Sequence, residues 1–311
     1  HKEHKACMAK SYGYQFKAGY IMLTNAWFNV LSQRQLVSCI LRYFKKREGM
    51  NLTELKNIIA QYSNTVKLNP NFRFRGQADK SWELEPSFTR LANKKKLDRN
   101  KALQLERECV NKFSISASKM ISLDKTIDLT LARFRSSDGW GLDFMGWFAH
   151  MQHFSAPTRL LDWTTSPWVA LYFACCERED CDGVIWIADF YKVTEHGNKK
   201  LNGSAFTSLM TDSKAQDIVI FTSMASSTHE RLEAQQGCFS ISTNPLSNHE
   251  TVLNESRCLI KISIPKELKQ ELLGELHQMN ITAKTLFPGI DGLGKSIYEY
   301  CHLWDETSLI V

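Results

Sequence analysis

Polar side chains that could do chemistry are concentrated in residues 151–174, which read MQHFSAPTRLLDWTTSPWVALYFA. They stand among Leu, Trp, Val and Phe residues, which are typical of a buried scaffold. Because burying a polar side chain is costly unless it has a partner or a function, this mixture predicts a polar site held by apolar elements. The candidates are His153, Thr158, Arg159, Asp162, Thr164, Thr165 and Ser166.

The same segment indicates which elements position these side chains. We expect a strand end over Leu160–Trp163, a hydroxyl-rich turn over Thr164–Ser166 and a buried helix over Pro167–Arg178. A Thr or Ser of the turn can cap the helix, and a proline suits its first position. A strand end, a polar turn and a helix N-terminus together place backbone N–H groups where they can bind an anion.

Several of these candidates also have a purely structural interpretation. Arg159 and Asp162 are expected to pair with each other and hold the turn. His153 is either a core or hinge histidine or a base. The turn Thr164–Ser166 caps a helix under either interpretation, and capping is compatible with substrate contact.

Arg75 is a further candidate, placed earlier in the chain at the end of a short aromatic strand. A structural ion pair with Asp79 or Glu83 is one interpretation of this arginine. The glycine that follows it, Gly76, suits close approach of the backbone to a ligand, so we favour a functional role.

The rest of the chain indicates an α+β fold. Helices are predicted over 25–44, 51–62, from the 94–101 charge cluster to Ser118, over Trp140–Phe154 and over Pro265–Met279. Strands are predicted over Phe72–Gly76, Gly183–Phe190, Asp217–Thr222, Gly237–Ser242, Cys258–Ser263, Thr282–Phe287 and Ser308–Val311. This order lacks the βαβ rhythm of a doubly wound sheet, and the sequence contains no GxGxxG, P-loop, GxSxG or HExxH motif.

Charge divides the chain at about residue 50. Residues 1–50 hold nine Lys or Arg against two Glu, a balance of +7, so the rest of the chain sums to −1 of the total of +6. We therefore distinguish a basic helical N-terminal region, 1–50, from a domain over 51–311. The N-terminal region is a candidate for docking a partner or a target, RNA and DNA included, although a solvated surface explains it as well.

Nine cysteines at irregular spacing predict reduced thiols in a cytoplasmic protein rather than a disulfide framework. Cys175, Cys176 and Cys181 lie close together in sequence, but they lack a CxxC pair and a matched histidine spacing, so we expect no metal site. No apolar run is long enough to span a bilayer, and we expect no membrane partner.

Three sequence blocks occur in a definite order: FRGQADKSWELEPSFTR at 74–90, QHFSAPTRLLDWTTSPWVALYFA at 152–174 and RLEAQQGCFSIS at 231–242. Together they resemble the FRG domain family, which is named for its Phe-Arg-Gly block. The later LFPGIDGLGKSI at 286–297 is similar to the C-terminal segment of that family. The resemblance covers about residues 51–297.

Within this resemblance, an arginine, a hydroxyl turn and an acid/amide loop are similar to the Arg–Ser–Glu arrangement of ADP-ribosyltransferases. The resemblance implies a core with a split mixed or antiparallel sheet around an NAD cleft. It implies that Arg75 grips NAD, that Thr164 belongs to the catalytic turn, and that Glu233 or Gln235 provides the third element. The implied NAD contacts are Arg75, Gly76, Gln77, His153, Thr158, Arg159, Asp162, Thr165 and Ser166.

The third element departs from the transferase pattern, which prefers a glutamate where this chain has Gln235. Three alternatives follow: Glu233 supplies the catalytic carboxylate, another acid such as Asp162 supplies it, or the domain binds a nucleotide without turning it over. A carboxylate is expected because departure of nicotinamide builds positive charge on the ribose.

The resemblance implies an NAD-dependent ADP-ribosyltransferase that acts as a toxin or anti-phage effector in the cytoplasm. Its acceptor would be a macromolecule, either a protein or RNA or DNA, and an antitoxin-like protein partner would keep it silent. An NAD glycohydrolase and a non-catalytic sensor that binds a nucleotide or a protein remain as alternatives. A nuclease is a weaker one, because the sequence lacks a cluster of metal-binding carboxylates.

Overall fold

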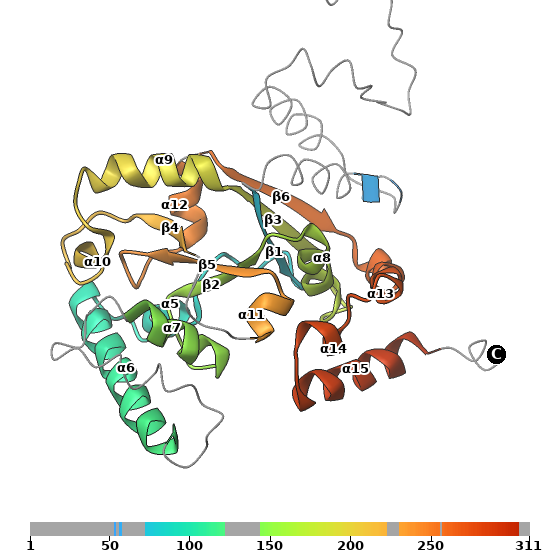
Figure 1. Cartoon of the computed structure of the whole chain (residues 1–311). Coiled ribbons are helices and arrows are strands. Elements are labelled where there is room, and N and C mark those ends of the chain that lie inside the picture. Colours follow the sequence, from blue (N-terminus) through green and yellow to red (C-terminus); the bar gives the residue numbers. More distant parts are fainter. Residues whose placement is uncertain are drawn as a thin grey trace, which may run out of the picture. The chain divides into compact units, whose positions relative to one another are not determined.

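The computed structural model describes residues 53, 56–57, 72–121, 144–222, 230–255 and 257–304. The chain divides into two units, His1–Gly49 and Met50–Val311, and all described residues belong to the second. The N-terminal helical region, most of the helix predicted over 51–62 and the strand predicted over 308–311 lie outside the described residues. Figure 1 shows the arrangement of the elements.

One six-stranded sheet forms the centre of the described unit, in the order β4-β5-β2-β1-β3-β6. All neighbouring strands are antiparallel, which confirms the α+β class and rules out a mixed sheet within the described residues. The strands are β1 (Phe72–Gln77), β2 (Leu160–Thr164), β3 (Gly183–Asp189), β4 (Val219–Thr222), β5 (Gly237–Ser242) and β6 (Leu259–Ile264). Six of the eight predicted strands therefore coincide with observed strands, and the one predicted over 308–311 lies outside the described residues.

The sheet is narrowest where β1 meets β2. These strands share a single register pair, Phe74 with Thr164, whereas β1 pairs with β3 over its whole length and β2 pairs with β5 in the same way. The two halves, β4-β5-β2 and β1-β3-β6, are thus joined by the shortest pairing in this continuous sheet.

Helices cover the sheet and follow its strands in Figure 1. Helix α8 packs on β1, β2 and β3, whereas α9 packs on β3 and β4. The helices are α5 (Ser87–Lys94), α6 (Arg99–Ile121), α7 (Phe144–His153), α8 (Pro167–Cys175), α9 (Phe190–Leu201), α10 (Phe206–Leu209), α11 (Glu230–Ala234), α12 (His249–Glu255), α13 (Lys269–Gln278), α14 (Ala283–Leu286) and α15 (Ile290–Leu303), with a 3-10 turn at Lys266–Leu268 before α13. No helix in the described part of the chain combines the length and apolarity needed to cross a membrane.

Helix α8 begins as the sequence predicts. Ser166 is its N-cap and accepts a hydrogen bond from the backbone N–H of Val169, and Pro167 occupies the first turn. The helix ends at Cys175, three residues before the predicted end, and Arg178 has a left-handed backbone with φ of 52°. That conformation cannot continue a right-handed helix.

The strand predicted over Thr282–Phe287 is wrong, because this segment contains the short helix α14. Thr282 and Thr285 form a capping box, in which each side chain bonds the backbone N–H of the other. The two threonines therefore satisfy the backbone of a helical turn.

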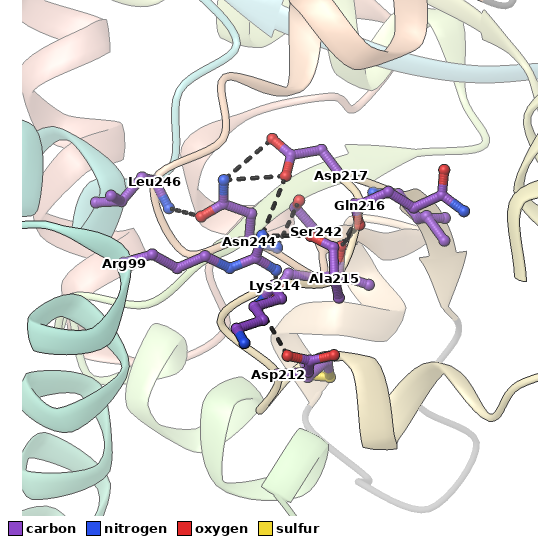
Figure 2. A network of polar contacts seen from close by, with 12 residues as sticks. Arg99, Asp212, Lys214, Ala215, Gln216, Asp217, Ser242, Asn244 and Leu246 are labelled. Atoms are coloured by element: carbon purple, nitrogen blue, oxygen red, sulfur yellow. Dashed lines mark hydrogen bonds and ion pairs between the residues drawn. The ribbon is translucent and has the colours of Figure 1, made fainter.

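A polar network fixes the segment that leads into β4 (Figure 2). Asn244, just after β5, donates to both carboxylate oxygens of Asp217 at 3.0 and 3.1 Å. Arg99 of α6 donates to the carbonyl of Ala215 and, at 3.3 Å, to the carbonyl of Thr243. These contacts join the start of α6 to the segments before β4 and after β5, and so stabilise the β4-β5-β2 half of the sheet.

Candidate functional site

Two cavities meet at the junction of β1 and β2. One, here called the β1 cavity, has a volume of about 230 Å³ and is lined by β1, β2 and the end of α8. The other, here called the α7 cavity, has a volume of about 260 Å³ and lies beside α7 and α11. Asp162, Arg231 and Gln235 line both. Each cavity alone is smaller than the roughly 300–1,000 Å³ of ordinary ligand sites.

Arg75 projects from β1 into the β1 cavity. Its Nη1 atom donates to the backbone carbonyl of Asp162 at 2.7 Å, and its buried Nε–H has no hydrogen-bond partner among the described residues. Burial lowers the pKa of the guanidinium and the charge of Asp162 raises it, but an arginine stays protonated in either case. A buried N–H donor without a partner is rare in proteins, and because Arg75 also lines a cavity, this donor is a candidate contact for a ligand.

The structural interpretation of Arg75 is wrong, because neither predicted acid pairs with it. Asp79 accepts hydrogen bonds from the backbone and hydroxyl of Ser81, and Glu83 accepts one from Asn248. The guanidinium is therefore held by one backbone carbonyl and remains available to an anion.

Gly76 and Gln77 line the β1 cavity, but both make contacts within the protein that have a structural role. A Cβ atom on Gly76 would lie 1.8 Å from the carbonyl oxygen of Ala170, so this glycine allows α8 to pack closely on β1. The expectation that Gly76 allows a ligand to approach the backbone is therefore wrong. Gln77 accepts from the indole of Trp186 at 2.6 Å and donates to the carbonyl of Glu83 at 3.2 Å. Both residues thus hold the wall of the β1 cavity in place through contacts with the rest of the protein.

Asp162 presents an exposed carboxylate where the two cavities join. Its Oδ2 accepts a hydrogen bond from the amide of Gln152 at 2.9 Å, and no described residue bonds to Oδ1. The carbonyl oxygen of Gln152 in turn accepts a hydrogen bond from the hydroxyl of Thr158. This chain of contacts orients the carboxylate and leaves one of its oxygens open to a ligand.

Arg159 does not pair with Asp162, and it lines neither cavity. Its fully buried guanidinium forms a two-pronged ion pair with Glu106 of α6 and donates to the carbonyls of Ser242 and Thr243 at 3.1 and 3.0 Å. Burial raises the pKa of Glu106, and Arg159 partly opposes that shift. Arg159 is therefore part of the core, and its predicted contact with NAD has no support in this geometry.

Thr158 is also fully buried, and its polar groups make hydrogen bonds within the protein. Its backbone N–H donates to the hydroxyl of Ser87 at 3.1 Å, and its carbonyl accepts from the backbone of Phe88 at 3.0 Å. It contacts the site through Gln152 and Ser87, both of which line the α7 cavity.

The hydroxyl turn joins β2 to the segment before β5. Thr164 lines the β1 cavity, donates to the carbonyl of Gln235 at 2.8 Å and accepts from the backbone of Ser166 at 3.0 Å. The backbone N–H of Thr165 donates to the carbonyl of Gln236 at 3.1 Å. Thr165 and Ser166 line neither cavity, so the turn positions Gln235 and caps α8.

The predicted acid/amide loop contains the short helix α11. Glu233 belongs to this helix, and Gln235 follows its end. Glu233 is exposed and lines neither cavity. Gln235 lines both, and its amide nitrogen donates to the carbonyl of Leu286 at 3.0 Å. An amide, not a carboxylate, therefore reaches the site from this part of the chain.

His153 lies at the end of α7 and lines only the α7 cavity. Its ring packs edge-to-face on Phe154 at a centroid distance of 4.8 Å. His153 and Arg75 therefore line different cavities, His153 the α7 cavity and Arg75 the β1 cavity.

Arg231 is the main site residue that the sequence reasoning missed. It lines both cavities, and its guanidinium lies 4.7 Å from the centroid of the Phe287 ring. The ammonium of Lys295 lies 4.1 Å from the same ring. The RLEAQQ block contained this arginine, but helical spacing alone could not show that it faces inward.

The β1 cavity also holds Trp82, Phe173, Cys176 and Glu177. Burial raises the pKa of the Cys176 thiol to about 12, so it is protonated at neutral pH and unsuited to act as a nucleophile. Within the described ranges, no cluster of His, Cys, Asp and Glu is arranged to hold a metal ion. The site therefore offers guanidinium groups for an anion, one oriented carboxylate and aromatic rings.

Comparison with curated proteins and with solved structures finds no match to this chain. The FRG blocks of the sequence surround the site: the Phe-Arg-Gly block provides β1, and the RLLDWTTSP stretch provides β2 and the start of α8. Residues 70–183 match the model of the FRG domain.

Proposed function

We propose that the double cavity binds NAD and that the domain transfers ADP-ribose from it to a macromolecular acceptor. The observation that carries this proposal is the buried Nε–H of Arg75, which has no partner among the described residues and lies beside Asp162. An unsatisfied guanidinium donor favours a phosphate, and the adjoining carboxylate favours a ligand that also develops positive charge.

Binding would use the two guanidinium groups that face the β1 cavity. Arg75 and Arg231 approach it from β1 and α11, so a pyrophosphate between them would receive charge-assisted hydrogen bonds from two sides. Trp82 and Phe173 offer aromatic faces for the adenine or nicotinamide ring. The α7 cavity would then accommodate the other end of the dinucleotide or the acceptor.

The chemical step would break the glycosidic bond between the ribose C1′ atom and the nicotinamide nitrogen. Nicotinamide leaves as a neutral molecule with the bonding electrons, and the ribose becomes an oxocarbenium-like cation. Asp162 would stabilise that cation through its free Oδ1, since Gln152 already holds Oδ2. A nucleophilic oxygen or nitrogen of the acceptor then bonds to C1′ and loses its proton.

This role for Asp162 replaces the one that the transferase resemblance implied for Glu233. Glu233 is exposed and lines neither cavity, whereas Asp162 lines both. The proposal keeps Gln235 as a positioning residue, because its carbonyl accepts from Thr164 and its amide bonds to Leu286. An effector of this kind needs restraint inside its own cell, so we extend the proposal to a neutralising protein partner.

The test is incubation of the full chain with NAD labelled in its adenylate part, with and without cell lysate. Transfer of label to lysate macromolecules in the wild type supports the proposal, and separate nuclease and protease digestion identifies the acceptor class. Asp162→Asn should lower turnover by about two to three decades while leaving NAD affinity nearly unchanged. Glu233→Gln is the matched acid-to-amide control and should retain activity.

One observation favours a second candidate, a nucleotide-binding module without turnover. The position where the transferase pattern has its acid holds the amide of Gln235, which is already bonded to Leu286. In the same experiment this candidate predicts saturable NAD binding with intact NAD recovered. Release of free ADP-ribose without labelled macromolecules would instead identify a glycohydrolase.

A further inference from the structure

The ring of Phe287 carries two cationic side chains. The guanidinium carbon of Arg231 lies 4.7 Å from the ring centroid, and the ammonium nitrogen of Lys295 lies 4.1 Å from it. Arg231 belongs to α11 and Lys295 to α15, and α14, which Phe287 follows directly, contacts both helices. We call Arg231 and Lys295 the Phe287 cation pair.

The ring between the two cations is held by the fold. Phe287 is 8% exposed and packs edge-to-face on Phe173, at a centroid distance of 6.0 Å. Its backbone N–H donates to the carbonyl of Ala283 at 2.9 Å. A Cβ on Gly292 would lie 1.8 Å from the carbonyl oxygen of Phe287, so a glycine is needed for α15 to approach this closely. The cation pair therefore rests on a fixed aromatic support.

No carboxylate in the described part of the chain neutralises the pair. Within the described ranges, the side chains of Arg231 and Lys295 make neither an ion pair nor a hydrogen bond. Asp291 and Glu299 lie one helical turn from Lys295 on either side, but Asp291 is exposed and Glu299 is 4% exposed and accepts from the hydroxyl of Tyr172. Because both cations contact one ring, they are at most about 9 Å apart, and they repel each other unless an anion lies between them.

The pair adjoins the β1 cavity. Arg231 lines that cavity, and so does Phe173, on which Phe287 packs. Burial raises the pKa of the Cys176 thiol, another lining group, and the nearby ammonium of Lys295 opposes that shift. Lys295 thus lies close enough to the cavity for its charge to act there, although it is not itself part of the lining.

We propose that the Phe287 cation pair is a phosphate-binding site, in which Arg231 and Lys295 hold one phosphate or pyrophosphate group between them. A guanidinium offers a phosphate a two-pronged donor, and an ammonium offers it a compact charge. Two charge-assisted hydrogen bonds of about 2.8 Å, together with the width of the anion, fit between two cations at this separation. The inference rests on the proposed function in taking the ligand to be a nucleotide, and it adds Lys295 to the groups that hold it.

Two sources can supply this phosphate. One is the pyrophosphate of NAD, bound at the same time by Arg75 from the opposite strand of the cavity wall. The other is the backbone of a nucleic-acid acceptor, since Arg231 lines the α7 cavity as well as the β1 cavity. The chemistry of the cation pair is the same in both cases, so the experiment must separate them.

Isothermal titration of the full chain with inorganic pyrophosphate tests the site. The wild type should bind it with a submillimolar dissociation constant, and Lys295→Gln and Arg231→Gln should each weaken binding at least about tenfold. Lys295→Arg keeps the cation and should stay within about threefold of the wild type. Lys284→Gln, at an exposed lysine of the neighbouring helix α14, is the matched control and should bind like the wild type.

These side chains are at least partly exposed, so the variants should fold, and melting temperatures close to that of the wild type check this. A wild type that does not bind pyrophosphate at roughly 10 mM overturns the proposal, and so does either glutamine variant that binds it as tightly as the wild type.

Two further measurements on the same variants identify the source. Weaker binding of NAD in both glutamine variants assigns the phosphate to NAD. Unchanged NAD affinity with a higher nucleic-acid concentration for half-maximal transfer of label assigns it to the acceptor. If neither changes, the binding of pyrophosphate is adventitious and the proposal is wrong. A wild type that binds pyrophosphate through the cation pair but does not bind NAD would overturn the proposed function and leave the phosphate site standing.

Discussion

Replacing Arg159 with methionine separates two roles that the sequence allowed for this arginine, contact with NAD and support of the core. Methionine keeps much of the side-chain volume but removes the guanidinium. Glu106, which is 1% exposed, then loses its ion-pair partner, and the carbonyls of Ser242 and Thr243 lose a donor. An uncompensated buried charge of this kind costs about 3–5 kcal/mol of unfolding free energy, and protonation of the carboxyl limits the loss.

Thermal unfolding followed by circular dichroism measures this effect. In a unit of this size, each kcal/mol shifts the melting temperature by about 2–4 °C, so Arg159→Met should lower it by roughly 6–20 °C. Adding Glu106→Leu should recover most of the loss, because the double variant no longer buries a charge. NAD affinity per folded molecule should not change in the single variant.

The opposite pattern would refute this assignment. If Arg159→Met melts within about 2 °C of the wild type, a shift of under roughly 1 kcal/mol, and loses NAD binding, the arginine contacts the ligand and the core assignment is wrong.

Three further predictions concern the scaffold. Gly76→Ala should lower the unfolding free energy by about 3 kcal/mol or more, because the new Cβ meets the backbone of Ala170, and a denaturant titration with an unchanged midpoint would contradict this. Burial lowers the pKa of His249 to about 3, so between about pH 6.5 and pH 3 the imidazole is neutral in the folded chain and protonated in the unfolded chain. The unfolding free energy that depends on His249 should therefore be full above about pH 6.5. It should fall by up to about 1.4 kcal/mol per pH unit as the pH is lowered from about 6.5 to about 3. His249→Asn should reduce the proton uptake on unfolding in this pH range by one, and so flatten the dependence of unfolding free energy on pH. An unchanged pH dependence would refute the assignment. Ser166→Ala should cost about 1 kcal/mol through loss of the α8 cap, and a melting curve identical to that of the wild type would argue against the cap.

The strands and the start of α8 could be predicted because their signals are local. β3 is a largely apolar run and β5 begins at a glycine, and both coincide with the predicted strands within a residue. Ser166 and Pro167 are a cap and a first-turn residue whatever the rest of the chain does. Thr282–Phe287 failed because threonines favour strands by residue type but cap helices by hydrogen bonding.

The site could be predicted only in part, because its residues come together through long-range packing. Arg75, Asp162, Thr164 and Gln235 do line the β1 cavity. The burial of Arg159 could not be foreseen, since its partner Glu106 lies 53 residues earlier on a helix with no distinguishing motif. The inward position of Arg231 and the outward position of Glu233 depend on the phase of a five-residue helix, which is too short for a periodic pattern.

Isothermal titration of the full chain with NAD tests the nucleotide site most directly, comparing the wild type with Arg75→Lys and Arg75→Gln. The wild type should bind NAD with one site per chain, and both variants should weaken binding at least about tenfold, because neither side chain replaces a guanidinium on a phosphate. Their melting temperatures should stay close to that of the wild type, since Arg75 donates to only one carbonyl of the fold. A wild type that does not bind NAD, or variants that bind it as tightly as the wild type, would contradict the nucleotide site.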